Sequence, residues 1–180
     1  MLQQVTISSV KDTLFTNFWD LYVSAFPQQE RRDRAYQEKT LALENYHLEA
    51  FLSNDQFVGF IGWWQLDEIC YIEHLATLPS LRGHGIGREA LESFMANQSS
   101  PIILEVEHPE DEISRRRIGF YQRVGFILNN YQYEHPPYRL ESDEPVSLIL
   151  MSYPNPITHT LFSSFKSLCF SEVHFIHHAN

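Results

Sequence analysis

The chain has 180 residues, of which 43% are hydrophobic and 20% charged, an ordinary composition for one globular domain that excludes intrinsic disorder, collagen-like repeats and a coiled coil. Thirteen Lys and Arg against 23 Asp and Glu give a formal net charge of -10. This field repels nucleic-acid phosphates and anionic membranes, so neither is an expected partner, whereas cationic small molecules are attracted.

Cysteine usage and the amino terminus predict a cytoplasmic protein. Cys70 and Cys169 are too few for a disulfide framework and have no C-x-x-C spacing. The segment Met1 to Val10 lacks the charged flank and apolar run of a signal peptide, and no stretch approaches the ~18 consecutive apolar residues of a membrane span. We therefore expect a reducing environment and no membrane association.

The first half of the chain predicts a strand, two helices and a meander. Val5 to Val10 alternates as a strand does, and apolar residues then recur at helical spacing from Leu14 until Pro27. Arg31 to Leu43 is a second, more polar helical stretch. Three extended segments of an antiparallel meander follow: Tyr46 to Leu52, Phe57 to Leu66 and Ile69 to Leu78.

The second half begins with one βαβ unit. Its helix starts near Ile86 inside a glycine-rich loop, and its second strand runs from Ile102 to Glu107. Another helix extends from about Ser114 to Val124 and ends at Gly125, a residue suited to the left-handed position past a helix. Two closing strands are expected at Phe126 to Tyr133 and Val146 to Met151.

We expect one domain over residues 1–153, followed by a tail over residues 154–180. Pro154 and Pro156 separate the two parts. The apolar residues of the tail, from Leu161 to Cys169, predict a short amphipathic helix to which the sequence assigns no function.

The strongest local signal is the loop Pro79-Ser80-Leu81-Arg82-Gly83-His84-Gly85-Ile86-Gly87, between a strand and a helix. Glycines let backbone N–H groups approach an anion, and the helix N-terminus adds positive charge, which suits a pyrophosphate. A P-loop would need Gly-Lys-Ser/Thr, whereas Arg88 and Glu89 follow Gly87. A dinucleotide fingerprint would need a small residue at Arg88, although Glu105 or Glu107 has the spacing of its ribose acid.

The third interpretation of the loop is Arg82-x-x-Gly85-x-Gly87 between a meander and a βαβ unit. In this form the chain resembles the GNAT superfamily of acyl-CoA-dependent N-acyltransferases, whose pyrophosphate loop reads Gln/Arg-x-x-Gly-x-Gly/Ala. The segment Gly119-Phe120-Tyr121-Gln122-Arg123-Val124-Gly125-Phe126 also matches, because these proteins have a tyrosine shortly before a Gly-Phe pair. The order of elements from Val5 to Met151 fits the same plan.

The resemblance implies a set of binding residues for acetyl-CoA, and the sequence departs from the family pattern at one of the expected positions. Its loop would be Arg82, Gly83, His84, Gly85, Ile86 and Gly87, and the preceding strand would contribute Leu75 and Thr77. Many members have Asn seven positions before the tyrosine, in contact with the pantetheine arm, and this chain has Ser114 there. Ser114 can still form a hydrogen bond or cap a helix.

Strand alternation places carboxylates on two faces that could share a cleft. Tyr71, Glu73, Leu75 and Thr77 lie on one face of their strand, and Glu105 and Glu107 lie on one face of the next strand along the chain. A single glutamate is more often solvated or paired with arginine, but Glu105 lies between Leu104 and Val106 on a short inner strand. Glu105, Glu73 and, in third place, Glu107 are therefore candidate bases.

These groups match the needs of acetyl transfer to an amine. An alkylammonium has a pKa near ~10 and must lose a proton, which a carboxylate can accept directly or through water. The resemblance implies that the backbone N–H of Leu75 stabilises the tetrahedral oxyanion. Tyr121 keeps its proton at neutral pH and can donate it to the departing sulfur, unless it only packs on the sheet. No metal is required.

Other polar clusters have simpler explanations. Arg115, Arg116 and Arg117 could meet CoA phosphates but are more often a solvated face paired with Glu110, Asp111 and Glu112. Trp63 and Trp64 face opposite sides of a strand, so one is expected in the core. His74 is interpreted as a satisfied core residue and Cys70 as strand packing. For His174, His177 and His178, a frayed end is simpler than a metal site.

The sequence thus predicts an α/β protein with a mixed, mostly antiparallel twisted sheet flanked by helices and one splayed parallel strand pair. The predicted activity is transfer of an acetyl group from acetyl-CoA to a primary amine, with a cationic small molecule favoured by the net charge. An acyl-CoA sensor without turnover is the alternative, and a nicotinamide-dependent reductase is a third interpretation. A homodimer is compatible with the sequence.

Overall fold

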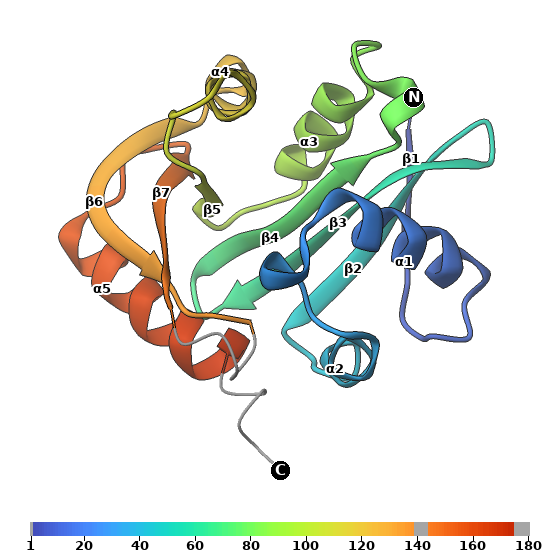
Figure 1. The fold of residues 1–180 in the computed structure, drawn as a ribbon, viewed down its shortest axis with the longest axis horizontal. Coiled ribbons are helices and arrows are strands. Elements are labelled where there is room, and N and C mark those ends of the chain that lie inside the picture. The colour runs from blue at the N-terminus through green and yellow to red at the C-terminus, as the bar shows by residue number, and fades with distance from the viewer. Residues whose placement is uncertain (1, 139–143, 175–180) are drawn as a thin grey trace. The chain divides into compact units, whose positions relative to one another are not determined.

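The computed structural model describes residues 2–138 and 144–174. Its seven strands form one mixed sheet in the order β1-β2-β3-β4-β5-β7-β6, mostly antiparallel with one parallel pair, β4 and β5 (Figure 1). The predicted fold class is confirmed. None of the described helices has the length and apolar character needed to cross a membrane.

The first of two compact units consists of residues 1–65 and 72–97. β2 pairs antiparallel with β1 and with β3. The strands with residues in this unit are β1 (Gln3–Thr6), β2 (Tyr46–Ser53), β3 (Gln56–Leu66) and β4 (Ile69–Thr77). The helices are α1 (Thr13–Ala25), α2 (Arg34–Thr40) and α3 (Ile86–Ala96), with 3-10 turns η1 (Gln28–Glu30) and η2 (Pro79–Leu81).

Alternation along β3 determines which helix covers each face of this unit. Phe60 packs edge-on against Phe18 of α1, with ring centroids 4.7 Å apart. Trp63, whose side chain points to the other face of β3, contacts Phe94 of α3, with ring centroids 5.5 Å apart. α1 and α3 therefore lie on opposite faces of the sheet. As predicted, the helical pattern of α1 ends just before Pro27, which has no N–H for a further helical turn.

The second unit consists of residues 66–71 and 98–180. β7 pairs antiparallel with β5 and with β6, and the β6 pairing shifts register between Asn129 and Tyr133. The first residues of β4 belong here, and the Cys70 N–H donates to the Pro101 carbonyl at 2.9 Å. The other elements are β5 (Ile102–Val106), α4 (Glu112–Val124), β6 (Ile127–His135), β7 (Val146–Tyr153), α5 (His159–Leu168) and the π-helix η3 (Cys169–His174).

Helix α5 packs on the sheet of the second unit through Phe165, which is fully buried. The Phe165 ring lies 5.2 Å from the Tyr71 ring and 5.7 Å from the Tyr133 ring. The boundary predicted at residue 153 stays a prediction, but the helix that follows it is joined to this core by aromatic contacts.

Two predicted elements differ most in extent from those observed. The predicted strand from Val5 to Val10 is wrong in its second half, because the N–H groups of Ser8 and Ser9 donate to the Asp12 carboxylate at 2.8 and 3.0 Å and turn the chain. The helix predicted at Arg31 to Leu43 is shorter than expected, because only Arg34–Thr40 (α2) is helical. Asp33 is its N-cap, and the Asp33 side chain accepts a hydrogen bond from the Tyr36 N–H. Gly125 has the predicted left-handed conformation, with φ +107°.

Candidate functional site

The glycine-rich loop from Arg82 to Gly87 joins η2 to α3. Gly83 and Gly85 have φ of +83° and +81°, values that residues with a side chain rarely adopt. Gly85 is also the N-cap of α3, and no side chain caps that helix end among the described residues. The backbone N–H groups of the first helical turn are therefore left for another acceptor, and the helix dipole favours an anion.

The loop is open to a ligand along most of its length. Arg82, Gly83, His84 and Gly85 are exposed, and Ile86 and Gly87 are half-buried. Within the described part of the chain, and apart from the adjoining residues, no heavy atom lies within 4 Å of where a Cβ on Gly83 or Gly85 would stand. Their requirement for glycine therefore comes from the backbone angle and not from crowding.

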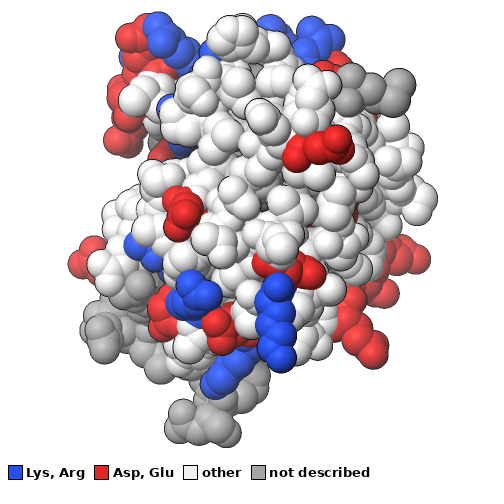
Figure 2. All heavy atoms as spheres, turned by 90° about the vertical axis from the view of Figure 1, so that its right-hand side faces the viewer, with Lys and Arg blue, Asp and Glu red and all other residues white. Residues whose placement is uncertain are grey.

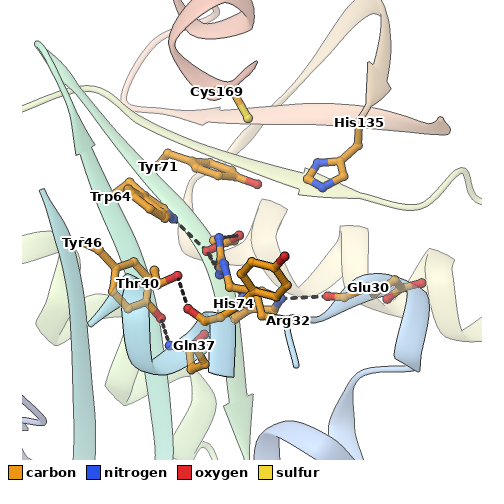
Figure 3. A network of polar contacts seen from close by, with 12 residues as sticks. Glu30, Arg32, Gln37, Thr40, Tyr46, Trp64, Tyr71, His74, His135 and Cys169 are labelled. Atoms are coloured by element: carbon orange, nitrogen blue, oxygen red, sulfur yellow. Dashed lines mark hydrogen bonds and ion pairs between the residues drawn. The ribbon is translucent and has the colours of Figure 1, made fainter. Parts of the chain in front are cut away.

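Glu73, one of the candidate bases, lies in a buried ion pair in the first unit. Its oxygens accept hydrogen bonds from the two Nη atoms of Arg32 at 2.6 and 2.8 Å, and both side chains are fully buried. The Trp64 indole N–H donates to Oε2 at 2.7 Å (Figure 3). Both carboxylate oxygens of Glu73 are thus engaged.

The contacts of Glu73 also set its charge state. Burial by itself would raise the pKa of Glu73, but the Arg32 guanidinium, with His74 and the Trp64 indole N–H, holds that pKa well below its ordinary range. A carboxylate that retains its charge so firmly is a weak proton acceptor. Glu73 therefore has the character of an anchor for Arg32.

Glu105, the candidate base that the sequence ranks first, is on β5 in the second unit. The Tyr71 hydroxyl donates to its Oε2 at 2.9 Å. The Nδ1 atom of His135 lies 3.0 Å from Oε1. A tenth of the Glu105 side chain is exposed. Glu105 is consequently held by hydrogen-bonding neighbours while keeping some access to solvent.

Glu107, the third candidate base, forms an exposed ion pair with Arg117 of α4 at 2.7 Å. Both side chains are well exposed, so solvent screens the interaction. The other arginines of the basic run also have partners: Arg115 donates to the carbonyls of Pro109 and Glu110, and Arg116 pairs with Glu112. The run is exposed, as the solvated-face interpretation predicts. Arg116 has the predicted partner Glu112, whereas Arg117 pairs with Glu107 and Arg115 binds backbone carbonyls.

Tyr121 lies on α4 and is half-buried. Its ring packs between those of Phe120 and Phe126, at centroid distances of 5.2 and 5.7 Å. Burial raises the pKa of Tyr121 to about 12, against the opposing effect of Arg117. The phenol therefore stays protonated over the whole range in which an enzyme is assayed.

Ser114 is engaged at the start of α4. Its N–H and its hydroxyl both donate to Asp111 Oδ1, at 2.7 and 2.9 Å, and Asp111 is the N-cap of the helix. These two bonds lower the pKa of Asp111. Ser114 therefore forms hydrogen bonds, as expected, but Asp111 and not Ser114 caps the helix. Contact of Ser114 with a pantetheine arm stays a prediction.

Several predictions about single residues are confirmed by burial and contacts. His74 is 4% exposed, and its Nε2 lies 2.9 Å from the Glu30 carbonyl (Figure 3). Trp64 is fully buried, whereas Trp63 is half-buried, donates to Glu49 at 2.8 Å and stacks on His47. Cys70 is buried in its strand.

The described residues contain no group of three or more His, Cys, Asp and Glu arranged to hold a metal ion. Of the three histidines considered for such a site, His174 is buried beside the rings of His135 and Tyr138. His177 and His178 lie outside the described residues.

The sequence of the chain matches the model of the acetyltransferase (GNAT) family over residues 12–126. The chain belongs to this family. A GNAT-family protein from Bacteroides thetaiotaomicron is 34% identical, with 97% of this chain and 98% of that chain covered and a TM-score of 0.87. The protein is therefore an acyl-CoA-dependent N-acyltransferase by family, as the sequence predicted.

Two more distant GNAT structures share the fold. Naa50 of Arabidopsis thaliana, in complex with the bisubstrate analogue CoA-Ac-MVNAL, is 21% identical over 86% of this chain and 99% of its own, with a TM-score of 0.60. A GNAT acetyltransferase from Elizabethkingia anophelis with acetyl-CoA bound is 16% identical over 84% and 96%, with a TM-score of 0.58. No curated protein matches the chain.

Sequence reasoning missed two partners in this GNAT protein. Arg32 is 41 positions from Glu73, and His135 is 30 positions from Glu105. The alternation of Tyr71 and Glu73 was recognisable, but nothing in the spacing of Arg32 or His135 indicated that either would meet a carboxylate.

Proposed function

We propose that this protein transfers an acetyl group from acetyl-CoA to a primary amine by direct attack of the amine on the thioester. The observation that carries the proposal is the loop from Arg82 to Gly87. It combines two left-handed glycines with the uncapped start of α3, and it occurs in a chain of the GNAT family. Backbone N–H groups there would bind the pyrophosphate of CoA, with the exposed Arg82 and His84 at its edge.

Glu105 is the carboxylate that we assign to proton acceptance. Glu73 is fully buried against a guanidinium, and Glu107 is well exposed in an ion pair with Arg117. Glu105 is intermediate, because hydrogen-bonding neighbours hold it while a tenth of its side chain is exposed and no arginine is paired with it in the described contacts. An ammonium acceptor must lose a proton before its nitrogen can attack, and Glu105 would take that proton directly or through water.

Two further roles complete the proposed reaction. The backbone N–H of Leu75 would stabilise the oxyanion of the tetrahedral intermediate, with Thr77 beside the cofactor on the same strand. Tyr121 would donate its proton to the departing CoA sulfur. Because its pKa is about 12, the phenol is a hydrogen-bond donor that keeps its own proton until the sulfur is developing charge.

A cationic small molecule, such as a polyamine or an amino sugar, is the acceptor class that we propose. The net charge of -10 supports it, since a negative field concentrates cations near the protein. A peptide amine is the competing class, because the bisubstrate analogue in the Naa50 complex, CoA-Ac-MVNAL, joins CoA to a short peptide.

The test is release of CoA thiol from acetyl-CoA in the presence of an amine panel containing polyamines, amino sugars and short peptides. We expect amine-dependent release and an acetylated product of matching mass. A thermal shift with acetyl-CoA, and none with NAD(P), would separate the proposal from a reductase, because a ligand that binds only the folded state raises the melting temperature. A shift with acetyl-CoA but no turnover of any amine would instead indicate an acyl-CoA sensor.

A further inference from the structure

Gly59 is buried in β3, and the end of β4 passes close over it. A Cβ placed on Gly59 would stand 2.5 Å from the Ala76 carbonyl oxygen and 3.1 Å from the Thr77 Cα. In a regular sheet a Cβ projects out of the pleat and stands clear of the neighbouring backbone. The φ of Gly59 lies outside the left-handed region, so the backbone angle does not call for glycine. The close approach of a second backbone does.

The neighbouring residue, Val58, forms a β-bulge. The residues on either side of it, Phe57 and Gly59, pair with consecutive residues of β2, so Val58 is an extra residue of β3. The Val58 carbonyl accepts a hydrogen bond from the Leu78 N–H at 2.9 Å. A bulge bends its strand and changes the direction of the groups on it. The bulge and the glycine thus lie side by side where the chain leaves β4.

The alternation along β3 shows on which face this crossing occurs. The pairing of β3 with β2 is regular from Gly59 to Trp64, so Gly59 faces the same side as Trp63. Trp63 packs on Phe94 of α3. The end of β4 therefore passes over β3 on the side of α3, the helix that follows the glycine-rich loop (Figure 1).

The connection from β4 to the glycine-rich loop is short and stiff. Leu78 is the N-cap of η2, and its carbonyl accepts a hydrogen bond from the Leu81 N–H at 3.0 Å. Pro79 occupies the first position of η2, where its ring fixes φ. The Arg82 N–H donates to the Pro79 carbonyl at 3.3 Å. A displacement of Leu78 is thus transmitted to Arg82 through a hydrogen-bonded turn.

We propose that Gly59, together with the bulge at Val58, is a positioning site for the cofactor loop. It allows the end of β4 to cross close over β3, and this crossing sets where the loop from Arg82 to Gly87 lies when it binds the pyrophosphate of CoA. This inference rests on the proposed function and adds to it two residues that touch neither substrate. They act through Leu78.

A methyl group on Gly59 would move the main chain of β4 and not a side chain. Because a Cβ essentially never lies closer than 3.0 Å to another heavy atom, the Ala76 carbonyl would have to retreat from 2.5 Å. A misplacement of about 1 Å in a binding group can cost roughly 10²-fold in rate. Ala76 also follows Leu75, whose N–H we assign to the oxyanion, so the chemical step should suffer together with binding.

The experiment measures the Kd of CoA by titration calorimetry for the parent and for Gly59→Ala, well below their melting temperatures. We expect Gly59→Ala to raise this Kd by about 10-fold and to lower kcat, with KM for the amine nearly unchanged. A purely structural role would lower the melting temperature without weakening CoA binding by the folded protein.

Gly62→Ala is the matched control, because Gly62 is a second buried glycine of β3. A Cβ there would stand 2.8 Å from the Tyr46 hydroxyl oxygen, which is the end of a side chain and lies away from the end of β4. We expect Gly62→Ala to lower the melting temperature, as Gly59→Ala does, and to keep the Kd of the parent for CoA. The pair separates displacement of the loop from a general loss of stability.

A second variant addresses the connection itself, for the case in which Gly59→Ala does not fold. Pro79 is exposed, so Pro79→Gly should fold, while its free φ would loosen the turn between Leu78 and Arg82. We expect a several-fold rise in the Kd of CoA with little change in melting temperature.

A folded Gly59→Ala protein that binds CoA as the parent does would overturn the inference and leave the proposed function intact. Equal weakening of CoA binding in Gly59→Ala and Gly62→Ala would do the same, as would a parental Kd in Pro79→Gly if Gly59→Ala does not fold. A parent protein that binds no CoA would overturn the proposed function and, with it, the inference.

Discussion

The buried pair of Arg32 and Glu73 ties the chain between η1 and α2 to β4. Because removing the negative partner would leave a buried cation without its counter-charge, we expect Glu73→Gln to lower the free energy of unfolding by about 3–5 kcal/mol. Urea unfolding measures this loss. The control is Glu38→Gln, which breaks an exposed pair with Arg34 and should cost less than about 0.5 kcal/mol. Equal stability of the two variants would contradict an anchoring role for Glu73.

The same pair makes stability depend on pH in a defined direction. The pKa of Glu73 is held below its unfolded value of ~4.3, so the folded state binds this proton less readily than the unfolded state does. The stabilisation is thus present above ~4.3 and is lost as the pH falls through the folded pKa. We expect the unfolding free energy of the parent to decline steeply as the pH falls from ~4.3 toward the folded pKa, and that of Glu73→Gln to decline less steeply. Urea unfolding between acidic and neutral pH measures both.

Tyr121 is expected to act in its protonated form. Because burial raises its pKa to about 12, activity that depends on this proton should be lost only as the pH rises through about 12. The rate profile of the parent should therefore show no alkaline limb caused by Tyr121 in the usual assay range. Tyr121→Phe should lower kcat by roughly 10²-fold at every pH in that range. A variant with the rate of the parent would assign the ring to packing against Phe120 and Phe126 only.

At the level of elements, the loop before α3 depends on backbone angles. Gly85 has φ +81° and open space where a Cβ would stand. Gly85→Ala should therefore lower the stability of the folded loop by about 1–2 kcal/mol through backbone strain, without a steric clash. Relief of that strain would move the N–H groups that we assign to pyrophosphate, so KM for acetyl-CoA should rise several-fold while kcat changes little. Steady-state kinetics with varied acetyl-CoA measure this.

A second glycine provides the control for that substitution. Gly119 lies in the interior of α4, where alanine is the better helix former and where a Cβ would meet only the flexible end of Arg123 at 3.3 Å. Gly119→Ala should leave KM for acetyl-CoA unchanged and should not destabilise the fold. A rise in KM for both variants would argue against a specific role for the loop.

The elements with strong local patterns were predictable from the sequence. The apolar period of α1, the left-handed Gly125 after α4 and the meander of β2, β3 and β4 follow from side-chain spacing and turn chemistry that act within a few residues. The loop before α3 was recognisable because its glycines and its position between strand and helix are also local.

The pairings that give the carboxylates their character were not predictable in the same way. Arg32 meets Glu73 because the chain after α1 returns over β4, and His135 meets Glu105 because β6 extends to residue 135 with a register shift. Local spacing contains no information on either event. Asn129 at that shift donates to the Leu150 carbonyl and the Ser152 hydroxyl, and accepts from the Ile157 N–H, so the irregularity is held by tertiary contacts.

For the whole molecule, the net charge of -10 acts at long range on both proposed substrates, with opposite sign. The face drawn in Figure 2 has basic side chains with acidic neighbours, so the charges there are interspersed. The long-range effect must then come from the excess of acids over the molecule as a whole. A cationic amine is attracted by this excess, whereas the phosphates of acetyl-CoA are repelled.

Salt separates these two effects, because the Debye length shortens from about 10 Å at 0.1 M to about 3 Å at 1 M. We expect kcat/KM for a polyamine to fall several-fold as salt rises over this range, and KM for acetyl-CoA to fall over the same range because its repulsion is screened. An aromatic amine that is uncharged at pH 7 serves as the control and should lose nothing. If the charged and the uncharged amines responded alike, the field of the protein would have no part in selecting the acceptor, and the choice would rest on groups in contact with it.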